Sequence, residues 1–454
     1  MHPNHLRTLF ALVVAALLTA LPAFAQANTG TIVGQVFNPA TGQYLRNAQV
    51  RIVESGDATI SADEGLFRLS PVPAGRVTLE VTYTGYRQVT ATVDVIAGAT
   101  ATKNFELVST LQDPAKTTTA PDGTVKLQAF TVSSEREGNA KAIMEQRNSM
   151  NITNTVASDA FGDNAEGNVG EFLKHLPGVE LDLFYGEVRT VRLGGLGSEY
   201  TSVTMDGIAL ASVDANNSGS GAARSFTMEM ASLNSMESIE VSKTVSADVD
   251  ANAPAGSINL RTKRAFDRSG RRVSWQANVV GHSSAFKLGQ SLGPDEDRTS
   301  QKITPGGIFE YSDVFLNKRL GIVLNLSESN VYQEALITSS AYSTAVTAAD
   351  TRPLVPTTLN FQWAPRTNKR FATTLTTDFK FNRELNFGLG VVYNYADLWT
   401  PQRTTIFNAS TRTAVVGADP LLGFTSAPTG TVQVNPVAVS KMGETFTLLP
   451  RVAY

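Results

Sequence analysis

The sequence predicts a mainly β protein with three folded parts in succession: an N-terminal β-sandwich, an α+β domain, and the first strands of an antiparallel transmembrane β-barrel. Short alternating strands separated by glycine and proline turns occupy residues 29–108, as in a sandwich. A short amphipathic helix, strands and hairpin signals occupy residues 140–264. Longer alternating strands with aromatic residues near their ends occupy residues 265–454, a pattern typical of a membrane barrel.

Composition narrows the classes of function. The 454 residues carry a formal net charge of −3, which argues against a large nucleic-acid interface. The chain has no cysteine, so disulfides, cysteine-ligated zinc and cysteine nucleophiles are excluded together. Of the four histidines, His2 and His5 lie in a segment that we expect to be removed, and His175 and His282 are far apart in sequence. We therefore expect no metal site, no cofactor, no catalytic residue and no enzymatic activity.

Residues 1–25 have the parts of a secretory signal peptide. Arg7 supplies a positive charge, residues 9–21 are an apolar run, and Pro22 ends the run before Ala-Phe-Ala at 23–25. About 13 apolar residues are too few to span a bilayer as a helix. No cysteine follows the cleavage site, which excludes a lipoprotein. We therefore predict that the protein is exported.

The predicted sandwich at residues 29–108 consists of short strands joined by tight turns. The expected strands are residues 31–36, 49–53, 66–69, 77–83, 91–95 and 103–107. The run Asp63-Glu64-Gly65-Leu66-Phe67, followed by Val72-Pro73-Ala74-Gly75 and Tyr83-Thr84-Gly85-Tyr86, resembles the carboxypeptidase regulatory-like domain. This resemblance implies a non-catalytic accessory module. Sugar binding and a role as a spacer both remain open for it.

Residues 109–139 are predicted to be a flexible linker, because they are polar and cannot bury a core. The linker contains one β-prone run, residues 125–132, which is Val125, Lys126, Leu127, Gln128, Ala129, Phe130, Thr131 and Val132. A lone strand with unpaired backbone groups is suited to pairing with the sheet edge of another protein. Its position and pattern resemble the TonB box of TonB-dependent receptors. An extended chain over residues 109–125 spans roughly 50 Å, enough to present this run to a partner.

The α+β domain at residues 140–264 begins with a helix signal. Asn168 and Glu171 form a predicted capping box, and Pro177 follows the helix. The apolar residues of this helix are Val169, Phe172, Leu173 and Leu176. Predicted strands cover residues 179–183, 188–193, 203–205, 208–210, 236–241 and 256–263. Asp206-Gly207 is a hairpin signal between two of these strands.

The order of motifs in this domain resembles the plug of TonB-dependent receptors. The matching runs are Leu176-Pro177-Gly178-Val179, Val191-Arg192-Leu193-Gly194-Gly195-Leu196-Gly197, Met205-Asp206-Gly207, Glu237-Ser238-Ile239-Glu240-Val241 and Ala255-Gly256-Ser257-Ile258-Asn259-Leu260. The chain most resembles a receptor group of Xanthomonas-like and Caulobacter-like bacteria. The resemblance implies TonB with the ExbB/ExbD energising complex as partner, the lipid of the outer membrane as surroundings, and an extracellular ligand.

A polar loop at residues 211–225 is a candidate ligand contact, because the resemblance places this region toward the outer mouth. Its candidate substrate-binding residues are Asp214, Asn216, Asn217 and Arg224. An unbound, solvated loop remains the alternative. Two other runs are interpreted without ligands: residues 194–197 lack the lysine of a phosphate loop, and residues 248–259 lack the glycine and the final acid of a calcium loop.

The membrane part is predicted from alternation at residues 273–279, 320–326, 371–379 and 385–395, in strands of about ten residues each. Residues 382–384 are expected to be a short periplasmic turn and residues 327–370 a long extracellular loop. Roughly 190 residues supply about eight strands, whereas barrels with a plugged lumen have about 22. An open half-barrel would leave edge hydrogen bonds in lipid. We therefore expect the chain to be an incomplete piece of a longer protein.

Two hypotheses for function follow. The first is a TonB-dependent outer-membrane receptor for active uptake of a scarce, large ligand of the carbohydrate or siderophore class. The second is a non-transporting surface protein that binds polysaccharide or mediates adhesion through the sandwich. The substrate is not readable from the sequence.

Overall fold

The computed structural model describes residues 28–110, 134–158, 167–174, 176–210, 225–228, 236–244, 251–268, 270–283, 288, 290–292, 299–346, 348, 354–382, 385–408, 415–416, 424–425 and 430–453. The chain divides into two compact units, residues 1–40 with 44–110 and residues 41–43 with 111–454. Strands dominate both units, so the predicted mainly β fold is confirmed.

The first unit is a β-sandwich with two four-stranded sheets. One sheet has the order β4 (Leu66–Pro73), β1 (Thr29–Phe37) and β7 (Thr100–Thr102), with β8 (Phe105–Glu106) also pairing with β1. The other has the order β3 (Ala58–Ile60), β2 (Gln49–Ile52), β5 (Gly75–Thr82) and β6 (Val89–Val95). Alternate side chains such as Ile32, Val36, Val50 and Leu79 are fully buried. Each predicted strand overlaps an observed one, and β3 and β7 are additional short strands.

The second unit begins with an α+β domain, called the inner domain here. Its elements in chain order are α2 (Ser134–Asn148), β9 (Thr153–Ala157), α3 (Val169–Leu173), β10 (Val179–Phe184), β11 (Glu187–Leu193), η5 (Ser198–Tyr200), β12 (Thr201–Met205), β13 (Ile208–Ala209), β14 (Met236–Ser242), β15 (Gly256–Thr262) and η9 (Ala265–Asp267). A five-stranded sheet has the order β13-β12-β15-β14-β9, and β10 and β11 form a separate hairpin. Strands β12 and β15 pair in parallel, and the other pairs are antiparallel.

Helix α2 differs from the sequence prediction. The polar residues 133–140 favour linker, whereas the helix begins at Ser134. Its buried side consists of Ala140, Ala142 and Met144 together with the charged Lys141. The apolar stripe by which a helix is predicted from sequence consists here of only two alanines and one methionine, so the helix is not predicted.

The predicted start of α3 is confirmed. Asn168 Oδ1 accepts a hydrogen bond from the Gly170 N–H at 2.8 Å, as an N-cap should. Glu171, expected to reach back to Asn168, instead pairs with Lys174 at 2.5 Å. A Cβ at Gly170 would lie 2.3 Å from Val188 Cγ1, so the helix packs directly on β11.

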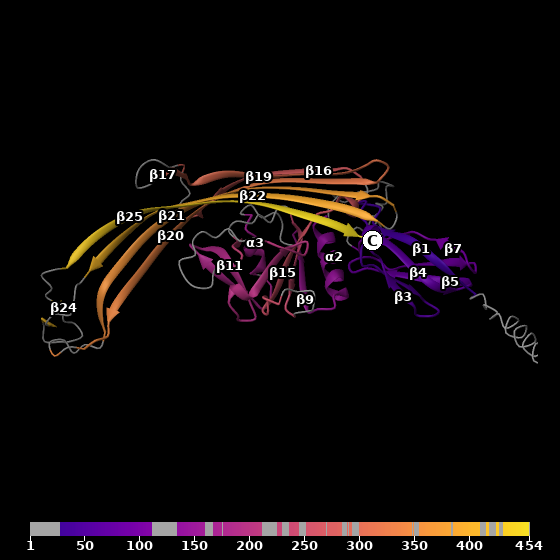
Figure 1. Ribbon diagram of the computed structural model, residues 1–454, viewed down its shortest axis with the longest axis horizontal. Helices are drawn as coiled ribbons and strands as arrows, with labels where there is room; N and C mark the ends of the chain where they lie inside the picture. Colours follow the sequence, from indigo (N-terminus) through magenta and orange to yellow (C-terminus); the bar gives the residue numbers. More distant parts are fainter. Residues whose placement is uncertain are drawn as a thin grey trace, which may run out of the picture. The chain divides into compact units, whose positions relative to one another are not determined.

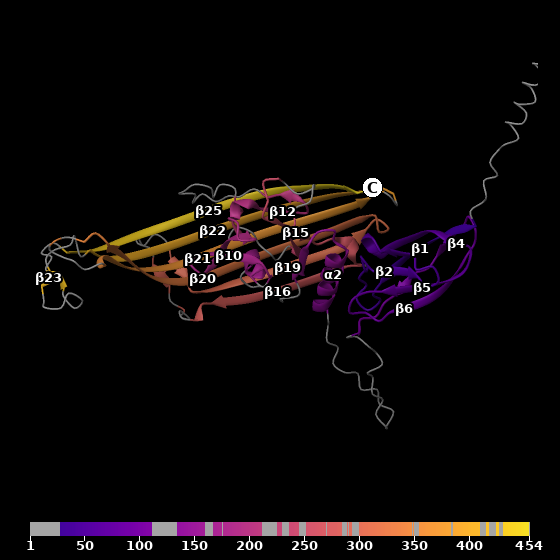
Figure 2. The same cartoon turned by 90° about the horizontal axis from the view of Figure 1, so that it is seen from below.

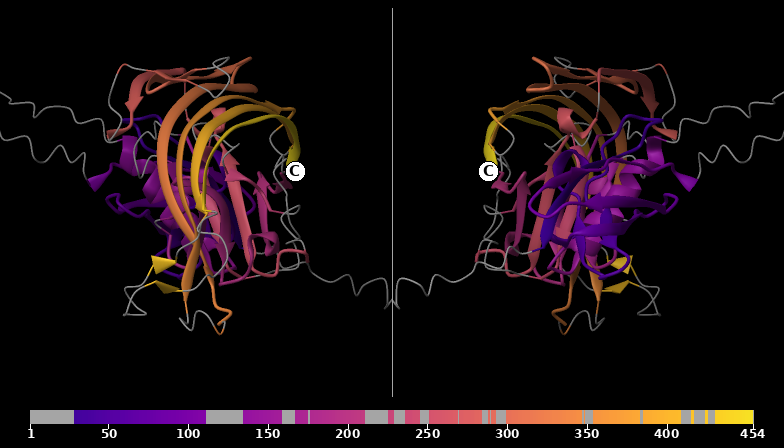
Figure 3. Two further views of the ribbon diagram at one scale, coloured as in Figure 1. Left: turned by 90° about the vertical axis from the view of Figure 1, so that its left-hand side faces the viewer. Right: turned by 90° about the vertical axis from the view of Figure 1, so that its right-hand side faces the viewer.

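Six antiparallel strands, called the wall here, follow the inner domain. They are β16 (Arg272–Gly281), β19 (Ile303–Phe315), β20 (Leu320–Ser343), β21 (Val355–Lys380), β22 (Asn386–Asn408) and β25 (Thr431–Ala453), paired in that order. Two short hairpins are formed by β17 (Gln290–Leu292) with β18 (Thr299–Gln301) and by β23 (Val415–Val416) with β24 (Phe424–Thr425). The wall runs along the inner domain in Figures 1 and 2, and the end-on views of Figure 3 show it curving around one side. In the described residues β16 and β25 remain open edges, and no closed barrel is formed.

The prediction of strand length and loop position in the wall is wrong. Strand β20 has 24 residues and β21 has 26, against an expectation of about ten. The long loop expected at residues 327–370 is mostly strand, because β20 continues to Ser343 and pairs with β21 from Val355. A strand of 24 residues at about 3.3 Å per residue extends well beyond the apolar band of an outer membrane, about 25 Å tall. Past that band lipid no longer enforces alternation, so the sequence pattern disappears while the backbone ladder continues.

The two faces of the wall have different chemistry. Trp275, Val279 and Phe446 point outward and are 77%, 73% and 66% exposed. Polar side chains such as Asn325 and Thr374 are buried on the inner face. In the described part of the chain, no helix has both the length and the apolar character needed to cross a membrane.

Candidate functional site

A single apolar core joins the inner domain to the wall. It contains α3, β11 and β15 side chains, and it also includes Val392 of β22 and Leu449 of β25. Polar and charged contacts also join parts of this unit, and three groups of them are described in turn.

The first group is centred on Glu187, the first residue of β11. Tyr185 and Gly186 have φ values of 51° and 86° and form the tight reversal before it. This hairpin aims Glu187 at the wall, where its side chain is 4% exposed. A buried carboxylate needs nearly all of its lone pairs satisfied, so the partners of Glu187 decide whether it can remain charged.

The wall supplies those partners from alternate residues of β21. Arg370 forms an ion pair with Glu187 Oε1, and Arg366 Nη2 lies 3.7 Å from Glu187 Oε2. Asn368 Nδ2 donates to both carboxylate oxygens at 3.1 and 3.0 Å. From the inner domain, Asn168 Nδ2 donates at 3.3 Å. One buried acid is therefore held by two arginines and two amides.

The tip of the same hairpin forms an aromatic and amide contact. The Phe184 and Tyr185 rings meet edge to face with centroids 4.4 Å apart. Tyr185 Oη donates to Gln402 Oε1 at 3.0 Å and accepts from Gln362 Nε2 at 3.1 Å. The Arg366 guanidinium lies 5.5 Å from the centre of the Phe184 ring.

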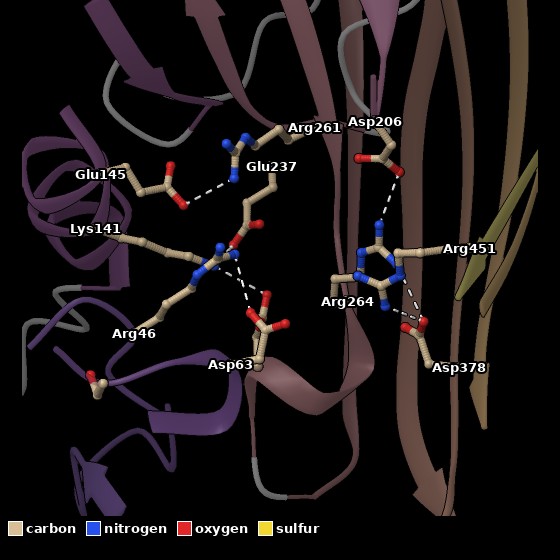
Figure 4. A network of polar contacts seen from close by, with 12 residues as sticks. Arg46, Asp63, Lys141, Glu145, Asp206, Glu237, Arg261, Arg264, Asp378 and Arg451 are labelled. Atoms are coloured by element: carbon tan, nitrogen blue, oxygen red, sulfur yellow. Dashed lines mark hydrogen bonds and ion pairs between the residues drawn. The ribbon is translucent and has the colours of Figure 1, made fainter. Parts of the chain in front are cut away.

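The second group links β15 to the wall through Arg264, shown in Figure 4. Arg264 Nη2 lies 3.2 Å from Asp206 Oδ2 of the inner domain, and its Nη1 lies 3.2 Å from Asp378 Oδ1 of β21. Arg451 of β25 also pairs with Asp378, at 2.5 Å. Asp206 is placed by the predicted hairpin turn, in which Asp206 and Gly207 have φ values of 49° and 83°. Four alternating charges therefore connect the turn to two wall strands.

The third group holds α2 against the inner-domain sheet and is also seen in Figure 4. Lys141 Nζ lies 2.6 Å from Glu237 Oε1 of β14 and 3.1 Å from Asp267 Oδ2 of η9. Arg261 pairs with Glu145 of α2 at 3.5 Å. Helix α2 is therefore attached by these ion pairs as well as by its buried Ala140, Ala142 and Met144.

Acids outnumber bases around Lys141, and this shifts pKa values. Burial lowers the pKa of Lys141, but Asp267, Glu237 and Glu145 together outweigh burial and raise it above its ordinary value. Burial raises the pKa of Glu237, and Asp267 and Glu145 raise it further against the attraction of Lys141. The pKa values of Lys141 and Glu237 are therefore both raised, which favours the charged form of the lysine and the protonated form of Glu237.

Charged and amide groups regain water when an interface opens, so the net stabilisation from such contacts is far smaller than their gross strength. In the described residues no group of three His, Cys, Asp or Glu side chains is placed to hold a metal ion. The shifted acids and bases neutralise one another within ion pairs.

Several predicted site residues lie outside the described residues. They are the predicted TonB box at residues 125–132 and the ligand-contact candidates Asp214, Asn216, Asn217 and Arg224. The residue run at 194–197 is described, and it is the expected tight turn: Gly194 and Gly195 have positive φ, and the Leu196 N–H donates to Leu193 O at 3.1 Å.

Sequence reasoning missed Glu187, Arg366, Arg370 and Lys141. Arg366, Asn368 and Arg370 alternate in the sequence, which is the spacing of one strand face. That signal was available, but it falls within the stretch that was predicted to be a loop.

An α+β domain held by ion pairs against the concave face of an antiparallel sheet has the arrangement of a plug. Residues 145–257 match the TonB-dependent receptor plug domain family, and residues 31–108 match the carboxypeptidase regulatory-like domain family. The chain therefore carries a carboxypeptidase regulatory-like domain followed by a TonB-dependent receptor plug domain, and the inner domain is the plug.

The chain is also similar to solved outer-membrane proteins. The outer membrane transporter YddB from Escherichia coli is 10% identical, with 66% of this chain and 54% of that chain covered and a TM-score of 0.29. The siderophore receptor PirA from Acinetobacter baumannii is 12% identical, with coverage of 68% and 57% and a TM-score of 0.29. The alcaligin receptor FauA from Bordetella pertussis is 11% identical, with coverage of 67% and 49% and a TM-score of 0.30. The chain thus spans about half the length of these three proteins. No curated protein sequence matches it.

Proposed function

We propose that the chain belongs to a TonB-dependent outer-membrane receptor that takes up a scarce, large ligand of the carbohydrate or siderophore class. The plug-domain match over residues 145–257 carries this proposal. The charged contacts between plug and wall support it, because a plug that moves needs an interface that is specific and also able to open.

The proposed mechanism depends on which membrane can supply energy for uptake. The outer membrane is leaky to small ions and holds no useful potential, so work must be delivered mechanically from the inner membrane. In the proposal, ligand binding at the outer side exposes residues 125–132, and TonB pairs with this strand and pulls on it. Helix α2 begins at Ser134, directly after the strand, so it is the first described element to bear the load.

When TonB pulls, the ion pairs that hold the plug are the contacts that must open. The contacts of Lys141 and Arg261 attach α2, and the contacts of Arg264 and Glu187 attach the remainder of the plug to the wall. Opening these contacts exposes charged groups to water, which lowers the cost of movement compared with opening an apolar interface.

The test is the substitution Leu127→Pro, which removes a backbone donor and disfavours the strand. The natural full-length protein is produced in its host and assayed with radiolabelled neutral oligosaccharides and ferric siderophores. We expect the variant to bind the same probe as the natural protein and to lose its uptake. Thr118→Pro, a proline in the linker outside the predicted box, should leave both unchanged. Normal uptake by Leu127→Pro would refute the assignment of the box.

A further inference from the structure

We propose that the ligand of this receptor is a neutral saccharide, bound on the outer side of the plug between the Phe184–Tyr185 tip and the uncharged upper part of the wall. The proposal rests on the transport function above and specifies its substrate class. Four steps lead to it.

The first step is the position of the hairpin tip. Short turns of outer-membrane barrels lie on the periplasmic side, and the hairpin closed by Phe381 and Leu385 is such a turn. The tip contacts Gln362 and Gln402, which lie far along β21 and β22 from this turn. Phe184 and Tyr185 are therefore at the outer end of the plug, where a ligand arrives.

The second step is the identity of the side chains that face the lumen above the tip. Inward positions are fixed by the unbroken register of β21 with β22 and of β22 with β25, anchored by the Tyr185 contacts. Polar inward side chains level with Gln362 are Thr404 and Asn435, and those beyond it include Thr358, Asn360, Asn408 and Gln433. On β20 the paired inward positions are Ile337, Ser339 and Ala341. Among the described residues of these four strands, no inward position beyond Gln362 bears a charge.

The third step is the contrast with the lower part of the same face. Below the tip, β21 alone directs Arg366, Arg370 and Asp378 inward, and each of them pairs with a plug residue. Arg366, Arg370 and Asp378 are therefore placed where they hold the plug, whereas the described inward positions of these strands level with Gln362 and beyond it carry no charge.

The fourth step is the chemistry of recognition. Amides and hydroxyls both donate and accept hydrogen bonds, which matches a ligand that presents many hydroxyl groups and no net charge. An aromatic ring offers a flat apolar surface to the C–H face of a sugar ring, and Tyr185 is held in place by two amides. An anionic ferric chelate would instead require opposite charges on the wall to offset its desolvation.

The experiment measures binding by the purified full-length receptor in detergent. The probes are a panel of neutral gluco-, xylo-, galacto- and chito-oligosaccharides, together with ferric catecholate and ferric hydroxamate chelates. We expect at least one oligosaccharide to bind and the chelates not to bind. Tyr185→Ala should weaken that binding about tenfold or more. Phe407→Ala, which removes an outward-facing ring at the same level of the wall, should not change it.

A charge pair then tests neutrality directly. Gln433→Glu and Gln433→Lys place opposite charges of similar length on the inner wall. A neutral saccharide should lose affinity in the same direction, or not at all, in both variants, with little dependence on salt. An anionic ligand should bind more tightly to the lysine variant and more weakly to the glutamate variant.

The outcomes separate this proposal from the transport function. Binding of a ferric chelate with the charge-dependent pattern, or no saccharide binding by the natural receptor, overturns the substrate class alone. Saccharide binding without any TonB-dependent uptake leaves the site in place and overturns the transport function, because binding at the tip does not require the predicted box.

Discussion

At the scale of single residues, the decisive feature is a buried acid shared between two parts of the chain. Glu187 comes from the plug, and Arg366, Asn368 and Arg370 come from the wall. A buried ion pair contributes little net stability when it is complete, yet removing one partner leaves an uncompensated buried charge. Such a contact enforces one docking position without binding the plug irreversibly.

Glu187→Gln should therefore destabilise the folded plug and wall by about 3 to 5 kcal/mol, because it leaves Arg366 and Arg370 buried without their carboxylate. Limited proteolysis of the plug in urea, followed by mass spectrometry, measures this effect. Glu180→Gln is the control, since Glu180 is 53% exposed and lies 3.8 Å from Arg192. Equal stability of the two variants would contradict the proposed role of Glu187.

The cluster around Lys141 predicts a dependence on pH. The pKa of Glu237 in the folded protein lies above its ordinary value of 4.5, chiefly through burial. Its contribution to stability is therefore complete below pH 4.5 and is lost as the pH rises through the folded-state pKa. The raised pKa of Lys141 also makes stability fall as the pH rises, but only in strongly alkaline solution.

Protection of the α2 amides should accordingly fall as the pH is raised above 4.5 and through the folded-state pKa of Glu237, and Glu237→Gln should flatten this dependence. Amide hydrogen exchange, corrected for the pH dependence of the intrinsic exchange rates, measures the protection of α2. Glu171→Gln, at the carboxylate that pairs with Lys174 on α3, should retain the slope of the natural protein. A slope that survives in Glu237→Gln would show that another group is responsible.

At the scale of elements, the sequence predicts those strands and turns in which packing against a core or lipid requires a regular alternation of apolar side chains. Strands β10, β11, β12, β14 and β15 and the Asp206-Gly207 turn were predicted because alternation and turn chemistry both mark them. Helix α2 and the outer halves of β20 and β21 are not predicted from the sequence. The buried side of α2 includes a lysine, and the outer halves of β20 and β21 pair through residues with polar side chains. Contacts such as those of Glu187 depend on which strand faces the plug, and that follows only from the register.

One glycine shows how tightly the plug sheet is specified. Gly256 begins β15 with a φ of 127°, and a Cβ there would lie 2.3 Å from Ser242 O. Gly256→Ala should destabilise the plug by about 2 kcal/mol or more through backbone strain and the clash. Thermal unfolding followed by circular dichroism measures the loss, with Ser257→Ala as the neighbouring control. An unchanged melting temperature would show that the sheet can adjust at this position.

At the scale of the whole molecule, charged and uncharged side chains occupy different parts of the inner face of the wall. Ion pairs gather where the plug docks, and amides and hydroxyls line the strands above it. This division links the two proposals: in the first the lower face holds a plug that moves, and in the second the upper face binds the ligand. Only the first of these two proposals requires force to reach the plug through the predicted box at residues 125–132.

Pairing of that segment with TonB is the most direct test. The chain has no cysteine, so Gln128→Cys introduces a single thiol into the full-length receptor. In cells whose TonB carries one cysteine in its receptor-binding region, we expect a disulfide-linked receptor–TonB product. The product should be lost when Leu127→Pro is added to Gln128→Cys. Absence of the product, or an undiminished yield in the double variant, would contradict the claim that this chain is driven by TonB.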